Sequence, residues 1–233
     1  MFYSIKRYIS QWKHKNILIH VGKCGGSSLL RATELSDKVK ITGRVHVAKP
    51  VFFKNQNYFI VARDPLTRCI SAFNWRYKLV VIDGSQKSRF VGEYEILKKY
   101  GTLNDIAEKL YDNSGELNLA VIAEFETIHH LRESISFYLK DFLQVCSPSN
   151  IKGVFMQETL NNDIEFHLGV PSSEVTREKL NQRSEGNSLS PLGKRCLVRF
   201  LENDYNCLFL LSNLGHIKKS DMLSIYQNAL SKS

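Results

Sequence analysis

The sequence predicts an α/β fold of three layers, in which a central parallel sheet is flanked by helices, together with a largely helical insertion. Residues 16–21 form an apolar strand segment that runs through a glycine-rich turn into a helical pattern over 26–36. Residues 57–62 and 66–80 repeat this order of strand, turn and helix, and residues 151–156 form a third apolar strand segment. Strands that alternate with helices in this way predict parallel pairing, with helices on the faces of the sheet.

Further segments have weaker patterns of their own. They are 44–48 (a short strand), 117–145 (mostly helical) and 191–230 (helices). Residues 82–116 are polar and interrupted by turn residues, so only short helices are expected there. The length suits one domain over 1–233, in which we expect 80–150 to be a helical, acceptor-binding insertion. Its part 82–116 is expected to lie over the site and not to form a core layer.

The charge balance favours acidic partners. Thirty-two Lys and Arg residues against 23 Asp and Glu residues give a net charge of +9. A nucleotide, an acidic glycan, a nucleic acid or a membrane surface would each suit such a protein. The basic residues are spread along the chain without a long run, which argues against a nucleic-acid partner.

The cysteines and the apolar segments bear on location. Five cysteines stand at irregular spacing without a CxxC pair, which predicts reduced thiols in the cytoplasm and gives no support to a zinc or redox motif. No segment approaches the roughly 18 consecutive apolar residues of a membrane span. Residues 1–15 are basic and aromatic and are expected to form a helix or ordered arm. Peripheral contact of this arm with a membrane surface remains an alternative.

The first chemistry-bearing motif is GKCGGSS, at 22–28, between the first strand and its helix. The glycines, Gly25 and Gly26, let the backbone approach an anion, and the helix N-terminus offers N–H groups and a positive dipole end. Lys23 adds a full charge, and Ser27 and Ser28 add hydroxyl donors. We therefore predict a P-loop-like anion site, the alternative being a flexible strand–helix turn.

This loop differs from that of nucleoside triphosphatases. Their motif is GxxxxGK[ST], whereas here the lysine precedes the paired glycines. No acidic residue at a strand end stands out as a magnesium ligand. An ordinary kinase or triphosphatase is therefore disfavoured, and no metal is expected.

The second motif is RDPLTRCIS, at 63–71, directly after the second strong strand. Arg63 follows the carboxyl end of a buried strand, where ligands bind in open α/β sheets, and can hold a phosphate bidentately. Ser71 comes two helical turns later and adds a hydroxyl if the helix packs toward the loop. Arg68 either shares that face or points to solvent. A purely structural pair of Arg63 with Asp64 is the alternative.

Together, IHVGKCGGSSL and FIVARDPLTRCISAF resemble the motifs of the sulfotransferases that use 3′-phosphoadenosine 5′-phosphosulfate (PAPS). The similarity is greatest to the carbohydrate branch, sulfotransferase family 2, whose motifs resemble HVPKTGGTSL and RDPxxRxxS. The second motif matches completely. The first has Gly22, Cys24 and Ser27 where proline, threonine and threonine are common, and none of these changes removes a needed donor. These two motifs cover under a fifth of the chain.

The resemblance implies a reaction and two anion pockets. The first loop would hold the phosphosulfate, and the 3′-phosphate would bind to Arg63 and Ser71. The residues implied for the first pocket are Lys23, Gly25, Gly26, Ser27 and Ser28. Arg183 lies in a late loop that closes over the nucleotide in the family. The reaction would be in-line transfer of a sulfuryl group, without a covalent enzyme intermediate, to a hydroxyl or less favourably an amine of a carbohydrate or glycolipid. Lys23 would offset the charge that grows on the leaving oxygen.

Histidines are the candidates for proton transfer and for acceptor binding. His46 resembles the catalytic histidine of uronosyl 2-O-sulfotransferases and can act as a neutral base near pH 7. A core histidine is the alternative for His46, and Glu34 and Asp37 are weaker candidates for the base. His129 and His130 resemble an acceptor-pocket segment of the family, the alternatives being a solvated helix face and a metal site.

Two other functions remain open on the sequence. A nucleotide kinase-like phosphotransferase would require magnesium and would prefer ATP to PAPS. A non-catalytic nucleotide- or polyanion-binding protein would bind adenosine 3′,5′-bisphosphate without turnover.

Overall fold

In a computed structural model, which describes residues 11–175 and 188–231, the chain is built on a four-stranded, all-parallel sheet. The strand order is β2-β1-β3-β4. The strands are β1 (Asn16–His20), β2 (Gly43–Val45), β3 (Asn57–Ala62) and β4 (Ile151–Met156). Helices flank this sheet, as the sequence predicts, and the arrangement is consistent with a three-layer α/β fold.

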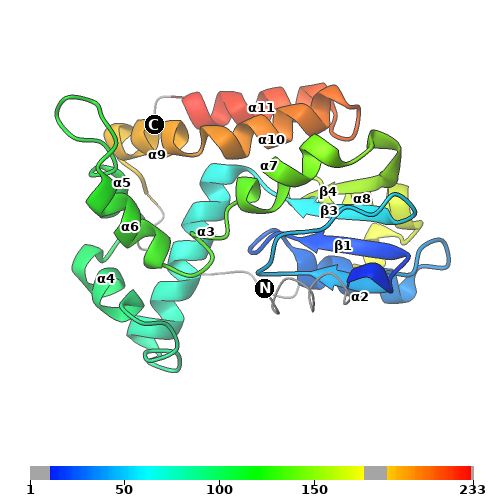
Figure 1. The fold of residues 1–233 in the computed structure, drawn as a ribbon, viewed down its shortest axis with the longest axis horizontal. Helices are drawn as coiled ribbons and strands as arrows, with labels where there is room; N and C mark the ends of the chain where they lie inside the picture. The colour runs from blue at the N-terminus through cyan, green and yellow to red at the C-terminus, as the bar shows by residue number, and fades with distance from the viewer. Residues whose placement is uncertain (1–10, 176–187, 232–233) are drawn as a thin grey trace.

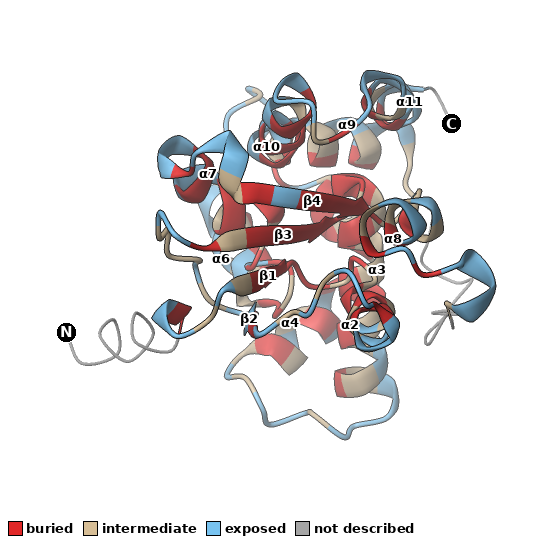
Figure 2. Cartoon of the chain, turned by 90° about the vertical axis from the view of Figure 1, so that its right-hand side faces the viewer, coloured by how far each residue is buried: buried red, intermediate tan, exposed pale blue. Residues whose placement is uncertain are grey.

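The sheet is buried on both faces. Ile17, Leu18 and Ile19 are consecutive residues of β1, so their side chains alternate between the two faces, and each is 0% exposed. Strands covered on both sides need continuous apolar runs, and this need explains why β1 and β3 could be recognised in the sequence. Figure 2 shows these strands coloured mostly as buried.

The helices that follow the strands carry the motifs. Helix α2 (Gly26–Leu35) follows β1, and α3 (Pro65–Tyr77) follows β3 and continues into a π-helical turn, η1 (Lys78–Ile82). Asp64 caps α3 by accepting hydrogen bonds from the N–H groups of Leu66 and Thr67, with Pro65 in the first turn. Helix α8 (Leu160–Leu168) follows β4 and packs against both β4 and α2.

Residues 83–145 are largely helical, and most of them lie to one side of the sheet (Figure 1). They form α4 (Glu93–Tyr100), α5 (Leu103–Ala107), α6 (Leu119–Thr127) and α7 (Ile135–Val145). Phe142 of α7 packs edge-on against Tyr58 of β3, with ring centres 4.8 Å apart, so α7 covers part of the sheet.

The C-terminal helices run along the top of the view in Figure 1. They are α9 (Pro191–Phe200), α10 (Glu202–Asn213) and α11 (Lys219–Leu230), and α10 packs against α7. The Tyr205 hydroxyl of α10 donates to Asp64 Oδ1 at 3.0 Å, so this layer also supports the cap of α3. Within the described ranges, no helix is long and apolar enough to cross a membrane.

Candidate functional site

The carboxyl ends of the parallel strands lie at one edge of the sheet, and a cavity of about 930 Å³ opens there. His20 of β1 is level with Val61 of β3, and Ala62 of β3 is level with Met156 of β4. The loops after these strands therefore line a common space. The predicted site residues that line it are Lys23, Gly25, Gly26, Ser27, Ser28, His46, Arg63, Ser71 and His130.

The first loop leads into the N-terminus of α2, where the first backbone N–H groups have no helical partners. Gly25 is the N-cap of α2, with φ of 82°, a left-handed conformation that glycine adopts without strain. The Leu29 N–H donates to Gly25 O at 3.1 Å and closes the first turn of α2. The N–H groups of Gly26, Ser27 and Ser28 precede it and so cannot make helical bonds of that kind. This loop can therefore offer backbone donors to an anion.

The glycine pair also lets a histidine approach the loop. A Cβ on Gly26 would lie 2.1 Å from His20 Nε2, so only glycine fits beneath that ring. His20 is buried, and burial lowers its pKa from 6.5 to about 3. His20 is therefore a neutral support of the loop, in agreement with its place at the end of a buried strand.

Lys23 and Cys24 point in different directions from the loop. Lys23 has φ of 69°, uncommon for a residue with a side chain, and its Nζ lies 4.4 Å from the ring centre of Trp75 in a cation–π contact. Cys24 is 0% exposed, and burial raises the pKa of its thiol to about 12. Lys23 thus faces the cavity, whereas Cys24 is a core residue unsuited to act as a nucleophile.

Arg63 connects the second motif to the first. Its Nε donates to Thr67 Oγ1 at 2.9 Å, and its Nη1 donates to the backbone oxygen of Lys23 at 3.4 Å. The alternative pairing of Arg63 with Asp64 is not what the structure has, because the Asp64 carboxylate caps α3. The guanidinium therefore lies between the two motifs for which anion binding is predicted.

Four residues of α3 that line the cavity were not identified from the sequence, namely Thr67, Ile70, Asn74 and Trp75. Thr67 and Trp75 line the cavity together with Ser71. Their spacing from Arg63, at four, eight and twelve residues, repeats about every turn and places them on one face of the helix. This period was the signal that could have identified them.

Arg68 does neither of the two things expected of it. Its side chain is 0% exposed, and its Nη2 donates to the backbone oxygens of His130, at 2.6 Å, and of Glu133. It therefore fixes the turn between α6 and α7 from inside the protein. Nothing in its position in the motif indicated this partner, which lies about sixty residues later in the chain.

The turn between α6 and α7 places its two histidines differently. His130 lines the cavity, whereas His129 is 8% exposed and does not. His129 stacks on Phe90, with ring centres 4.4 Å apart, and its Nδ1 lies 3.2 Å from Glu133 Oε2. Of the predicted acceptor pair, only His130 can therefore contact a molecule in the cavity directly.

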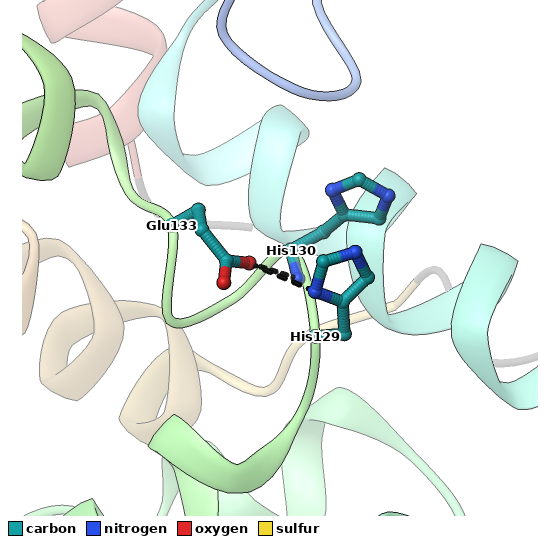
Figure 3. A group of neighbouring side chains, drawn as sticks. All are labelled: His129, His130 and Glu133. Carbon is teal, nitrogen blue, oxygen red and sulfur yellow. Dashed lines mark hydrogen bonds and ion pairs between the residues drawn. The ribbon is translucent and has the colours of Figure 1, made fainter. Parts of the chain in front are cut away.

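The same turn offers one grouping of possible metal ligands. Ligand atoms of His129, His130 and Glu133 lie within 4.8 Å of one another. However, Glu133 Oε2 accepts the His130 backbone N–H at 2.8 Å, and Oε1 accepts Arg132 Nε at 2.9 Å. In Figure 3 the two imidazole rings lie one above the other, and the side-chain contact to the carboxylate comes from His129. With the Arg132 and Arg68 guanidiniums at this turn, the group suits a hydrogen-bonded ion pair better than a metal ion.

The weaker candidates lie outside the cavity or outside the residues that the structure describes. Glu34 and Asp37, the alternative bases, are exposed and are not lining residues. Arg183 lies outside the described residues. Conversely, Glu158 lines the cavity directly after β4, and its Oε1 accepts the Asp64 N–H at 3.0 Å. It is an acid at a strand end that the sequence interpretation overlooked.

The buried imidazole of His20 predicts a loss of stability in acid. Its pKa is lowered in the folded state, so between pH 6.5 and about 3 the unfolded chain binds a proton that the folded chain does not. Stability therefore falls as pH drops below 6.5, by up to about 1.4 kcal/mol per pH unit for this group. Urea unfolding of wild type and His20→Gln at pH 7, 6, 5 and 4 should show a shallower slope in the variant. Equal slopes would contradict the assignment of a buried, neutral His20.

Comparisons with protein-family models, with curated proteins and with solved structures found no match to this chain.

Proposed function

We propose that this protein is a PAPS-dependent sulfotransferase with a P-loop-like fold, acting on a hydroxyl group, less favourably an amine, of a carbohydrate or glycolipid. One observation carries the proposal. The two motifs suited to anion binding border one cavity, and the Arg63 guanidinium, which donates to the Lys23 backbone oxygen, joins them. A nucleotide with phosphate groups at both its 3′ and 5′ positions is the ligand class that uses two such sites at once.

The first loop would hold the 5′-phosphosulfate. Gly25, Gly26, Ser27 and Ser28 offer backbone and hydroxyl donors, and Lys23 offers a charge. Arg63 and Ser71 would hold the 3′-phosphate. In this arrangement Thr67 orients Arg63 by accepting from its Nε, which leaves other guanidinium donors to the anion.

The transfer step would be direct. The acceptor oxygen forms a bond to sulfur while the bond from sulfur to the bridging phosphate oxygen breaks, and adenosine 3′,5′-bisphosphate leaves with the electron pair. Lys23 offsets the charge that grows on that oxygen, and His46 takes the acceptor's proton. The cysteine of the loop is buried, with a raised pKa, which supports a mechanism without a covalent cysteine intermediate.

The rest of the cavity would receive the acceptor. A volume of about 930 Å³ lies at the upper end of the range for small-molecule sites and can hold a second molecule beside a nucleotide. The polar side chains Asn74, Asn161 and Asn162 also line it and suit a hydroxyl-rich acceptor. The proposal keeps the cytoplasmic location, since all five cysteines are free.

The Arg63→Ala variant tests the 3′-phosphate pocket. Loss of a charge-assisted, bidentate contact should weaken binding of adenosine 3′,5′-bisphosphate by about 10- to 100-fold, since hydrogen bonds to charged groups contribute roughly 1.5–3 kcal/mol. Binding of adenosine 5′-phosphate, which lacks the 3′ group, should change far less. Isothermal titration of both nucleotides into wild type and variant measures this, and equal losses for the two would refute the assignment.

Glu158 is the one observation that favours the kinase-like alternative, because it brings a carboxylate to the cavity. A kinase would hold MgATP through such an acid, whereas a sulfotransferase needs no metal here. Competition between MgATP and adenosine 3′,5′-bisphosphate separates the two. Tighter binding of MgATP, abolished in Glu158→Gln, would favour the phosphotransferase.

A further inference from the structure

Three imidazoles line the cavity, those of His20, His46 and His130. His20 is the buried support of the first loop, whereas the other two come from different elements and have different surroundings. His46 follows β2 and His130 lies in the turn between α6 and α7, with ring centres 5.9 Å apart. A neutral imidazole has one N–H donor and one nitrogen with a lone pair. The hydrogen bond made by one nitrogen decides what the other can offer to a substrate.

The hydrogen bond made by one ring nitrogen of His46 fixes its tautomer and leaves the lone pair of the other nitrogen toward the cavity. His46 Nδ1 lies 2.9 Å from the backbone oxygen of His20. A carbonyl oxygen can only accept, so Nδ1 carries the proton and Nε2 has the lone pair. Burial lowers the pKa of His46, so the ring is neutral at pH 7. His46 Nε2 is therefore available as a base.

The contacts of His130 favour the opposite tautomer. Its Nδ1 is buried and has no hydrogen-bond partner among the residues that the structure describes. This nitrogen faces the loop, because a Cβ on Gly22 would lie 2.7 Å from it. A proton there would be a buried donor without an acceptor, which costs roughly 1–3 kcal/mol. Since the ring lines the cavity, we place Nε2 on the cavity side, where its N–H can reach a ligand.

The backbone holds His130 firmly in this position. The residue has φ of 69°, and its N–H donates to Glu133 Oε2 while its carbonyl accepts from Arg68. The titratable groups around it act in both directions, since His129, His46 and Lys23 lower its pKa and Glu133 raises it. Burial dominates and lowers the pKa to about 2, so the ring stays neutral.

We infer that the two imidazoles divide the chemistry of the site: His46 Nε2 is the general base, and His130 Nε2–H is a hydrogen-bond donor to an oxygen of the transferring sulfuryl group. This inference rests on the proposed function. The acceptor's proton passes to His46 as its oxygen bonds to sulfur, and the electron pair of the broken bond leaves with the 5′-phosphate. His130 keeps its proton throughout. Its ring lies beside the loop that would hold the phosphosulfate, where its N–H can donate to the sulfuryl group during transfer.

The first test needs neither nucleotide nor acceptor. Long-range ¹H–¹⁵N NMR of the ligand-free full chain at pH 7 distinguishes the two imidazole tautomers, and His46→Gln and His130→Gln assign the signals. The expected result is a proton on Nδ1 of His46 and on Nε2 of His130. A proton on Nδ1 of His130, or a charged His130 ring, would overturn the inference.

The second test separates donor from base by rate. Glutamine can donate a hydrogen bond but cannot act as a base, and leucine can do neither. With the acceptor found for wild type, His130→Gln should keep kcat within about tenfold, whereas His130→Leu should lose about 100-fold and His46→Gln about 100- to 10,000-fold. Affinity for adenosine 3′,5′-bisphosphate should be unchanged in all three, which also shows that they fold. A His130→Gln variant as slow as His130→Leu would refute the donor role. Absence of transfer by the wild type would instead refute the proposed function and leave the NMR result standing.

Discussion

Lys23→Ala is expected to lower the rate of sulfuryl transfer by about two to three orders of magnitude, the effect of removing one preorganised charge stabiliser from a transition state. The lysine lies in the turn that precedes α2, and its ammonium group lies over Trp75 at the cavity wall. Negative charge appears on the bridging oxygen only as the bond to sulfur breaks. The loss should therefore fall on kcat, and affinity for adenosine 3′,5′-bisphosphate should change by less than about tenfold.

The matched control is Lys152→Ala, which removes an exposed lysine from β4 outside the cavity. This variant should transfer sulfate at the wild-type rate. Transfer is measured as label passing from ³⁵S-labelled PAPS to the acceptor at saturating nucleotide. Near wild-type activity in Lys23→Ala, with an unchanged thermal unfolding midpoint, would remove Lys23 from the mechanism.

Arg76→Met is expected to lower the free energy of unfolding by about 3–5 kcal/mol, because it leaves a buried carboxylate without its cation. Arg76 of α3 donates from Nε and Nη2 to Glu93 of α4, at 2.8 and 2.6 Å. The two side chains are only 2% and 1% exposed. Glu93 Oε1 also accepts the His129 backbone N–H at 2.9 Å, so this pair joins α3, α4 and the histidine-bearing turn.

The double variant Arg76→Met/Glu93→Leu should lose less than the single one. It removes both charges, and the remaining cost is chiefly the unsatisfied His129 N–H, roughly 1–3 kcal/mol. Lys49→Ala is the surface control, since the Lys49–Asp141 pair is 47% and 67% exposed and should contribute less than about 1 kcal/mol. Urea unfolding at pH 7 measures all four proteins. A double variant less stable than Arg76→Met would contradict the account of the buried pair.

The sequence was most informative where buried strands run directly into helices. The continuous apolar runs of β1 and β3 are required by burial on both faces, so their positions could be predicted closely. The position of β4 could also be predicted, although the exposed Lys152 interrupts its apolar run. Parallel strands bring their carboxyl ends to one edge of the sheet. The parallel topology alone therefore places the loop of Lys23 near Arg63, without any contact being known from the sequence. The helix predicted over 66–80 instead ends at Tyr77 and passes into η1, a local change in hydrogen bonding without an evident signal in the residues.

The sequence was least informative where contacts join distant segments. Arg68 reaches the turn that carries His130, and Glu93 reaches the backbone of His129, across separations of 62 and 36 residues. The spacing of apolar residues within one segment does not indicate which distant residue a side chain will contact. For this reason His129 and His130 looked equivalent in the sequence, whereas the fold buries one and turns the other toward the cavity.

The most direct test of the central claim is transfer itself. The protein is incubated with ³⁵S-labelled PAPS and, in parallel, with γ-³²P-labelled MgATP, in each case with glycans and lipids extracted from the cells that produce it. The proposed function predicts that ³⁵S enters a carbohydrate or glycolipid, that Lys23→Ala slows this incorporation by about two to three orders of magnitude, and that ³²P does not enter. Incorporation of ³²P without ³⁵S would show a phosphotransferase, and tight binding of adenosine 3′,5′-bisphosphate without any incorporation would show a binding protein. Either result would contradict the assignment as a sulfotransferase.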